Sequence, residues 1–306
     1  MTLLLSRGDV AAAVDLDAVL DLLAAGFRTP VAAPAPLRIR TDLPGPGTAT
    51  CLLPGLLPDV PAYTVKVNAK FPAAMPALRG VVCLHSLVDG ELLALLDSAS
   101  VTAWRTGLAA ALGTHTLAPP SARTLGFVGA GAQATTTLAG LRHLRPWSRI
   151  VATDLDPTRA AALPAEALSS PAEVAAAADV VVLATWSREP LLGLADVHPG
   201  QHLTSLGADE PGKRELTADL LAASRLIVDD LDLALTGGAL GSAGLSADTC
   251  AGTLGAVLRG DLAEVEPVSL SVYSPVGLPW QDLALCWAVY REAVRSGRGT
   301  RGDLLG

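Results

Sequence analysis

Residues 124–134 read TLGFVGAGAQA, and this stretch decides the fold class. A short apolar run, residues 125–128, leads directly into Gly129, Gly131 and Ala134, which have the spacing G-x-G-x-x-A. In a strand–turn–helix unit the first glycine permits a tight turn, the second lets the backbone approach a pyrophosphate, and the small third residue lets helix and strand pack closely. The phosphates lie at the N-terminus of the helix, where backbone N–H groups favour anions. The predicted cofactor contacts of this turn are Gly129, Gly131, Ala132 and Gln133.

A second apolar strand follows the predicted helix and ends in an acidic residue. Residues 149–153 read RIVAT, and the next residue is Asp154. Its spacing from Gly129 along the sequence is close to the spacing found in dinucleotide folds, where a carboxylate after the second strand accepts hydrogen bonds from the adenosine ribose. The alternative is a βαβ unit with a glycine-rich turn and no ligand. Because strand, turn, helix, strand and acid follow in the expected order, we predict a dinucleotide site that includes Asp154.

The chain on either side of this unit follows two different patterns. From residue 124 onwards strands and helices alternate, which predicts a parallel sheet. Before it, residues 62–71 and 80–88 read as strands, and Asp89-Gly90 is a hairpin signal, which together predict an antiparallel sheet. A long helix is expected over residues 97–118. The sequence therefore predicts an α/β fold in which a Rossmann dinucleotide-binding domain is inserted into an α+β domain.

The predicted division of the chain follows from this insertion. The two domains are residues 1–118 with 266–306, and residues 119–265. Near residue 267 the alternation of Val268, Leu270 and Val272 predicts a strand that returns to the first sheet. A final helix is expected over residues 281–295, and the Gly- and Arg-rich segment after Ser296 is expected to be frayed.

Composition and charge exclude several classes of partner. Half of the 306 residues are hydrophobic and only 17% are charged, so the chain can bury a substantial core. The net charge of −8 argues against nucleic acid or an anionic membrane as partner. The N-terminus lacks the basic region and cleavage site of a signal peptide. No C-x-x-C or H-E-x-x-H pattern occurs, so we expect no metal site and no disulfide framework, and a cytoplasmic location.

Three charged residues are candidates for chemistry because of where they lie in the predicted elements. Lys66 lies on a predicted apolar strand, where it either faces solvent or needs a negative partner. Arg105 lies among alanine, leucine and glycine residues on the long helix, so it needs a protein carboxylate or an anionic ligand. Asp209 follows a predicted strand of the parallel sheet, and the carboxyl ends of such strands face the ligand crevice. It could act as a general acid or base there, or cap a helix.

Together these residues resemble one known family. The chain resembles the ornithine cyclodeaminase/mu-crystallin family over nearly its whole length. The shared positions are Pro36, Leu37, Arg38, Leu53, Pro54, Lys66, Thr102, Arg105, Thr106, the glycine turn with Gln133 and Ala134, Gly207, Ala208, Asp209, Pro211, Gly212, Lys213, Glu215, Gly277 and Asp282.

The resemblance implies a homodimer with a substrate-binding and dimerisation domain beside the Rossmann domain. It implies that Arg38, Lys66 and Arg105 hold a substrate carboxylate, that Asp209 is the catalytic acid/base, and that Lys66 also takes part in catalysis. It adds Thr106, Thr185 and Gly207 to the cofactor contacts. Members of the family transfer a hydride from the α-carbon of an amino acid to the nicotinamide and form an imine. The imine is then attacked by a distal amine in cyclodeaminases or hydrolysed in alanine dehydrogenase-like members, and ketimine reductases run the step in reverse.

The chain departs from the family pattern at three places. Cys51 stands where ornithine and lysine cyclodeaminases have a glutamate that can hold the distal ammonium, so we include Cys51 among the substrate-binding candidates. Leu155 stands where mu-crystallin has an arginine suited to NADP, which favours NAD(H). Ser274 and Pro275 replace Lys-Ser of mu-crystallin.

These departures order the functional hypotheses. The sequence favours an NAD(H)-dependent oxidoreductase that acts on the C–N bond of an α-amino or α-imino acid, such as an amino acid dehydrogenase or a ketimine or imine reductase. An ornithine or lysine cyclodeaminase is the alternative. A non-catalytic protein that binds a small ligand, like mu-crystallin, is the second alternative.

Overall fold

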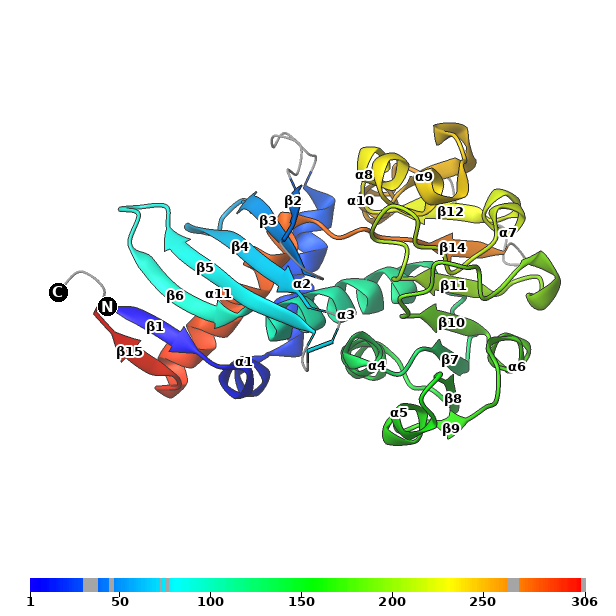
Figure 1. Ribbon diagram of the computed structural model, residues 1–306, viewed down its shortest axis with the longest axis horizontal. Coiled ribbons are helices and arrows are strands. Elements are labelled where there is room, and N and C mark those ends of the chain that lie inside the picture. The colour runs from blue at the N-terminus through cyan, green and yellow to red at the C-terminus, as the bar shows by residue number, and fades with distance from the viewer. Residues whose placement is uncertain (30–37, 44–46, 72, 75–76, 263–269, 304–306) are drawn as a thin grey trace. The chain divides into compact units, whose positions relative to one another are not determined.

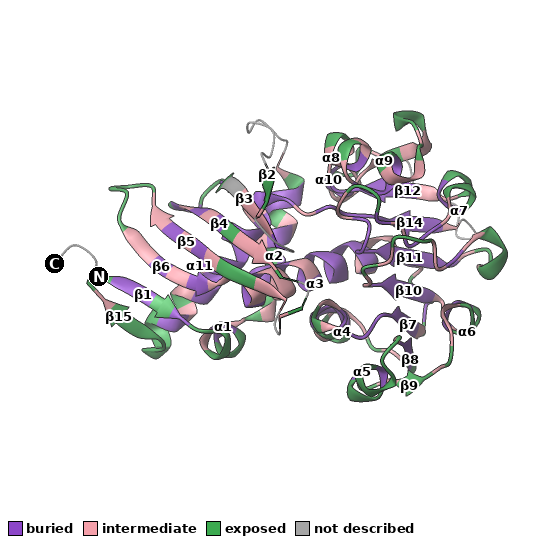
Figure 2. Cartoon of the chain, viewed as in Figure 1, coloured by how far each residue is buried: buried purple, intermediate pink, exposed green. Residues whose placement is uncertain are grey.

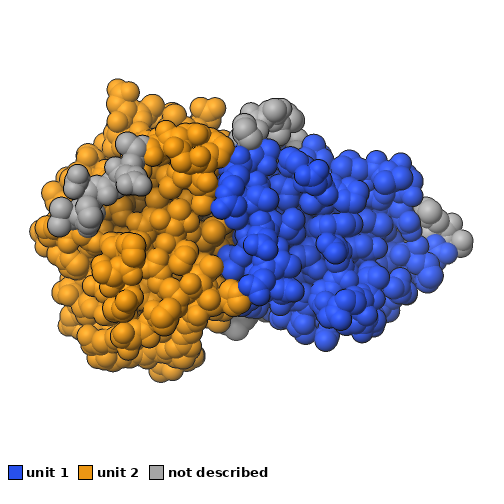
Figure 3. Space-filling view, turned by 180° about the vertical axis from the view of Figure 1, so that it is seen from behind, with its two compact units in different colours: residues 1–106, 278–306 blue, residues 107–277 orange. Residues whose placement is uncertain are grey.

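The described residues form two β-sheets, and each sheet is the centre of one compact unit (Figure 1). The computed structural model describes residues 1–29, 38–43, 47–71, 73–74, 77–262 and 270–303. Unit 1 comprises Met1–Thr106 with Leu278–Gly306, and unit 2 comprises Gly107–Gly277 (Figure 3). The sequence placed the domain boundaries after residues 118 and 265. The two units divide inside one helix, α3 (Ser98–Leu117), and just before another, α11 (Pro279–Ser296).

Unit 1 contains a seven-stranded sheet in the order β15-β1-β6-β5-β4-β3-β2. Its strands are β1 (Thr2–Leu5), β2 (Arg38–Asp42), β3 (Thr48–Gly55), β4 (Ala62–Lys70), β5 (Leu78–Ser86), β6 (Leu92–Asp97) and β15 (Thr300–Gly302). Neighbouring strands run antiparallel except β1 and β6. Because β15 pairs with β1, the expectation that the chain frays after Ser296 was wrong. The unpaired backbone N–H and C=O groups of an edge strand can pair with a further strand, and this pairing does not need an apolar pattern in that strand.

Helices cover one face of this sheet. They are α1 (Arg7–Ala13), α2 (Leu16–Arg28) and α11. Helix α11 packs on β3, β4, β5 and α2. It begins with Pro279, whose fixed φ suits a first helical position, and ends at Gly297, which adopts the left-handed conformation. Along β4 the side chains alternate, so that Lys66 is buried on the face towards α11 and Val67 is exposed on the other face. Figure 2 shows buried and exposed segments within this sheet.

Unit 2 contains an eight-stranded sheet in the order β13-β12-β14-β11-β10-β7-β8-β9, and its pairs are parallel. The strands are β7 (Thr124–Val128), β8 (Arg149–Thr153), β9 (Glu166–Ala167), β10 (Val180–Leu183), β11 (His202–Ser205), β12 (Arg225–Val228), β13 (Cys250–Thr253) and β14 (Ser271–Tyr273). Val181 and Leu183 of β10 join one apolar core, and Val180 and Val182 join another, so both faces of the sheet are covered. This explains why the sequence shows continuous apolar runs here rather than alternation.

The helices of unit 2 connect these parallel strands. They are α4 (Ala132–Leu144), α5 (Pro157–Ala162), α6 (Pro171–Ala177), α7 (Ala218–Ala223), α8 (Leu231–Thr236), α9 (Ala239–Ala243) and α10 (Leu254–Arg259), together with the second part of α3. Strands β9, β8, β7, β10, β11 and β14 follow the order of a dinucleotide-binding sheet, in which the strand order reverses between β7 and β10. None of the helices in the described part of the chain has the length and apolar character that a membrane span requires.

The last strand of unit 2 corrects one prediction. The strand expected near residue 267 was assigned to the first sheet, but β14 pairs with β11 and β12 in unit 2. Of the residues that predicted it, Leu270 and Val272 are described and Val268 lies outside the described residues. Alternating apolar residues indicate that a segment is extended, but they do not say which sheet it joins.

Candidate active site

The glycine turn after β7 has the geometry of a phosphate-binding turn. Gly129 has φ of 89°, and a Cβ at this position would lie 2.7 Å from the carbonyl oxygen of Ala184. Gly131 is the N-cap of α4, and no side chain caps that helix. A Cβ on Gly131 would meet no atom of the chain within 4 Å. The fold itself requires the glycine at 129, whereas the open space at Gly131 before uncapped N–H groups fits a pyrophosphate.

Asp154 is fixed against this turn. Its Oδ2 accepts a hydrogen bond from the backbone N of Ala130 at 2.7 Å, and its Oδ1 accepts one from the backbone N of Asp156 at 2.9 Å. Each carboxylate oxygen keeps a lone pair, which suits two ribose hydroxyls. The next side chain, Leu155, is fully exposed, and Arg159 lies 3.6 Å from Asp156. The predicted adenosine-binding residue is therefore held beside the glycine turn.

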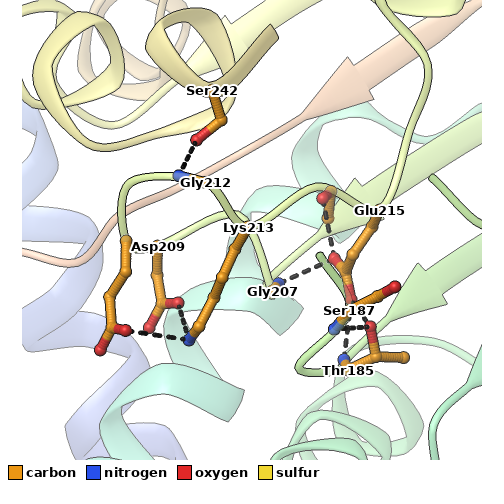
Figure 4. A network of polar contacts seen from close by, with 10 residues as sticks. Thr185, Ser187, Gly207, Asp209, Gly212, Lys213, Glu215 and Ser242 are labelled. Atoms are coloured by element: carbon orange, nitrogen blue, oxygen red, sulfur yellow. Dashed lines mark hydrogen bonds and ion pairs between the residues drawn. The ribbon is translucent and has the colours of Figure 1, made fainter. Parts of the chain in front are cut away.

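Glu215 links the ends of two neighbouring strands (Figure 4). It accepts hydrogen bonds from the backbone N of Thr185, which follows β10, and of Gly207, which follows β11, both at 2.7 Å. The Thr185 hydroxyl at 2.7 Å and the Ser205 hydroxyl at 2.8 Å complete the set. Burial raises the pKa of Glu215 above its ordinary value, although the four donors favour the carboxylate and act in the opposite direction. Thr185 and Gly207, both predicted cofactor contacts, are thus held together by a residue to which the sequence assigned no role.

Asp209 lies in the loop after β11 and is held by Lys213 (Figure 4). Lys213 Nζ donates to Asp209 Oδ1 at 2.7 Å and lies 3.6 Å from Glu210 Oε2. The Asp209 side chain is 31% exposed, whereas that of Lys213 is 7% exposed, so the carboxylate is the accessible member of the pair. Asp209 does not cap a helix, because the next helix begins at Ala218 with Thr217 as its N-cap. The alternative role as a helix cap is therefore wrong.

Two cations share one carboxylate in the core of unit 1. Lys66 Nζ donates to Asp282 Oδ1 at 2.8 Å and lies 2.6 Å from Oδ2. Arg105 Nε lies 3.3 Å from Asp282 Oδ1, and its Nη1 donates to Gln281 Oε1 at 3.0 Å. Lys66 is only 3% exposed, so it does not belong to a solvated strand face. Within this trio the positive charges outnumber the negative one, so a second carboxylate would balance the charge.

The strand register places two further predicted substrate contacts. The backbone of Arg38 pairs with Leu52, and Leu52 pairs with Lys66. The Arg38 side chain lies outside the described residues, as do Pro36 and Leu37. Cys51 pairs with Ile39 and Val67 instead. Directly opposite residues share a face and consecutive residues alternate, so Cys51 lies on the face away from Lys66. The structure brings Lys66 and Arg105 together but does not place Cys51 with them.

Helix α3 carries two hydroxyl groups with unused hydrogen-bonding capacity. The Oγ1 atoms of Thr102 and Thr106 are buried and have no hydrogen-bond partner among the described residues. Buried hydroxyls are normally paired, so such atoms point to a missing ligand or water. This is consistent with the predicted role of Thr106 as a cofactor contact.

Comparison with known proteins finds a matching family, similar sequences and similar structures. The model of the ornithine cyclodeaminase/mu-crystallin family matches residues 2–297. Alanine dehydrogenase of Archaeoglobus fulgidus is 30% identical over 240 residues, which cover 74% of this chain and 74% of the relative. L-lysine cyclodeaminase of Streptomyces rapamycinicus is 33% identical over 227 residues, covering 68% of this chain and 64% of the relative. The structure of an archaeal alanine dehydrogenase dimer with bound NAD is 26% identical, covers 99% of both chains and has a TM-score of 0.89.

Proposed function

Because the chain belongs to the ornithine cyclodeaminase/mu-crystallin family, we propose that it is an NAD(H)-dependent oxidoreductase acting on the C–N bond of an α-amino or α-imino acid. The observation that carries the proposal is the set of groups at the carboxyl ends of the strands in unit 2. The glycine turn, Asp154 and the accessible carboxylate of Asp209 all follow strands of this parallel sheet. A protein that only binds a small ligand needs no acid/base group at these strand ends. Asp209 therefore favours an enzyme over a binding protein like mu-crystallin.

Each unit supplies its own part of the chemistry. In unit 2 the glycine turn and Asp154 bind NAD(H), which when bound accepts or supplies the hydride. In unit 1 Lys66 and Arg105 donate charge-assisted hydrogen bonds to the substrate carboxylate and so orient the α-carbon. Arg38 joins them by its place in the family motif. Asp209 takes a proton from the amino nitrogen in oxidation and returns it in reduction.

An amino acid dehydrogenase or imine reductase is favoured over a cyclodeaminase. A cyclodeaminase must bind a substrate whose distal amine is protonated, and burying that ammonium without a carboxylate costs several kcal/mol. Cys51 stands where the cyclodeaminases have their glutamate, so this chain lacks that carboxylate. Because Cys51 lies on the sheet face away from Lys66, the support comes from the family motif and not from a contact beside Lys66 and Arg105. Neutral amino acids, their keto acids with an amine, or cyclic ketimines are the expected substrates.

One assay tests this proposal against the cyclodeaminase alternative. The protein is incubated with L-ornithine and catalytic NAD⁺, and proline and ammonia are measured. In parallel, NADH oxidation is followed with cyclic imines and with keto acids plus an amine. We expect no proline and clear NADH oxidation. Proline formation at about 10 per second, the rate of a median enzyme, would establish the cyclodeaminase instead. Binding without turnover of any of these substrates would favour the ligand-binding protein.

The cofactor preference is a prediction of its own. The Asp154 carboxylate suits ribose hydroxyls and repels a 2′-phosphate, and Arg159, a nearby cation, is paired with Asp156. We expect kcat/KM to be higher with NADH than with NADPH. Asp154→Ser should lower the ratio of kcat/KM with NADH to kcat/KM with NADPH. Arg159→Ala serves as the control and should leave the ratio unchanged. Equal or better kcat/KM with NADPH in the unmodified protein would refute the preference.

We also propose that the protein is a homodimer. One cross-strand row on the sheet face away from α11 contains Ile39, Cys51, Val67 and Val81. Ile39 is 55% and Val67 46% exposed, an apolar surface that a second copy can cover. Light scattering should give twice the chain mass of 31.1 kDa, and Val67→Lys should lower it. A monomeric wild type would contradict the proposal.

The dispersed free cysteines support a cytoplasmic location.

A further inference from the structure

Glu215 closes the base of the loop that carries Asp209. The loop leaves β11 at Gly207 and returns at Glu215, whose carboxylate binds the backbone N of Gly207 at 2.7 Å (Figure 4). The same carboxylate binds the backbone N and the hydroxyl of Thr185 beyond β10. A Cβ on Gly207 would lie 2.4 Å from the carbonyl oxygen of Thr185 and 2.5 Å from the Glu215 carboxyl carbon. The two strand ends are therefore in direct contact and fixed by one side chain.

The hydrogen-bond inventory of Glu215 explains why a carboxylate stands in this core. Oε1 accepts from the backbone N and hydroxyl of Thr185, and Oε2 accepts from the Ser205 hydroxyl and the backbone N of Gly207. Only a carboxylate offers four acceptor positions on so small a group. Glu215 is fully buried, so its charge is costly unless all four donors are present. Glu215 therefore holds the backbone at Thr185 and at Gly207 in one relative position.

The bonds of Glu215 also determine what Thr185 can offer to a ligand. The Thr185 hydroxyl gives its proton to Glu215 and accepts a bond from the backbone N of Ser187 at 3.2 Å. One lone pair is left. The half-buried hydroxyl can therefore only accept a hydrogen bond from a ligand, such as one from a ribose hydroxyl or a carboxamide N–H.

The position of Thr185 in the sheet indicates which part of the cofactor is concerned. Asp154 follows β8 and marks the adenosine side, while the glycine turn follows β7 between β8 and β10. Thr185 and Gly207 follow β10 and β11 on the opposite side of that turn. The nicotinamide half of the dinucleotide therefore belongs to their side.

We propose that Glu215 is a positioning residue for the nicotinamide half of NAD(H). It fixes the distance between the ends of β10 and β11 and makes the Thr185 hydroxyl a pure acceptor. The inference rests on the proposed use of NAD(H) by this chain, and it goes beyond it by assigning a role to a carboxylate that does not touch the ligand.

Glu215→Gln tests the four-acceptor arrangement with little change of shape. In one orientation the new amide NH₂ faces the backbone N–H of Thr185, and in the other it faces that of Gly207. Either way a donor meets a donor, and one strand end must move. Ser205→Ala is the milder second variant, because the Ser205 side chain is buried in β11 and its removal deletes only one donor to Glu215.

Asp179→Asn is the matched control. Asp179 precedes β10, and its Oδ2 accepts from the backbone N of Arg123 at 2.7 Å and of Thr124 at 2.8 Å. Like Glu215, Asp179 joins the ends of two neighbouring strands, β10 and β7, through its carboxylate, but it does so at the amino ends of the strands. Its replacement should lower the melting temperature without changing cofactor binding.

The readout compares NADH with ADP, which lacks the nicotinamide half. We expect the Kd for NADH to rise about tenfold in Glu215→Gln and about threefold in Ser205→Ala, while the Kd for ADP stays constant. Equal weakening of NADH and ADP would show a merely structural role and overturn the proposal, as would wild-type NADH affinity in both folded variants. If Glu215→Gln does not fold, Ser205→Ala decides alone. Failure of the wild type to bind NADH would refute the proposed function instead.

Discussion

Lys66→Met is expected to lower kcat/KM for the amino or imino acid by about thirty- to a thousand-fold, which corresponds to a loss on the order of 2–4 kcal/mol. The substitution keeps the length of the side chain but removes a charge-assisted hydrogen bond to the substrate carboxylate. Arg105→Leu should have an effect of similar size, because Arg105 lies 3.3 Å from the same Asp282. The Kd for NADH should change little, since the glycine turn and Asp154 belong to the other unit.

Controls separate this loss of substrate binding from a loss of folding. Lys66→Met leaves the buried Asp282 with fewer partners, and breaking a buried ion pair destabilises a protein by about 3–5 kcal/mol. In Lys66→Met the buried Asp282 keeps Arg105 as its partner, so the melting temperature and the NADH affinity of this variant show whether it remains folded. Lys70→Met replaces another lysine on β4 and should keep activity within about threefold. Wild-type kcat/KM in Lys66→Met would exclude the proposed carboxylate contact.

The nucleotide half of the fold was predictable because its signals are local in sequence. Gly129 and Gly131, the apolar strand before them and Asp154 after the next strand all lie within one βαβ unit, and the structure holds them together. The resemblance to the ornithine cyclodeaminase/mu-crystallin family is confirmed over residues 2–297. The strand at Ser271–Tyr273 was assigned to the wrong sheet, because three residues that return to a sheet carry no local signal of their partner.

The polar partners in the site were not predictable from local pattern. The sequence required a negative partner for Arg105, but the partner is Asp282 on the last helix, and Lys66 and Asp282 are 216 positions apart. Asp282 was recognised only as a motif position, although a carboxylate in the apolar run of that helix was a usable signal. Glu215 gives no local signal of its role, because its four donors converge only when two strands lie side by side.

Asp209→Asn is expected to lower kcat by about a hundred- to ten-thousand-fold, the usual contribution of a general acid or base. Reduction of an imine requires a proton on the nitrogen, and oxidation of an amine requires its removal. Asparagine has nearly the same shape and can still accept the hydrogen bond from Lys213, so the loop should keep its conformation. Its amide cannot exchange a proton at neutral pH, so the chemical step should be lost while NADH binding remains.

Glu210→Gln is the matched control for Asp209→Asn. Glu210 is the next residue in the same loop, and its Oε2 lies 3.6 Å from Lys213 Nζ. Both substitutions remove one negative charge beside Lys213, but only Asp209 is proposed to exchange a proton with the substrate. We therefore expect Glu210→Gln to keep kcat within about threefold of wild type. If both variants lose kcat equally, the charge balance around Lys213 matters rather than the proton of Asp209. If neither loses it, the proton comes from another group, and Asp209 is not the acid/base of this reaction.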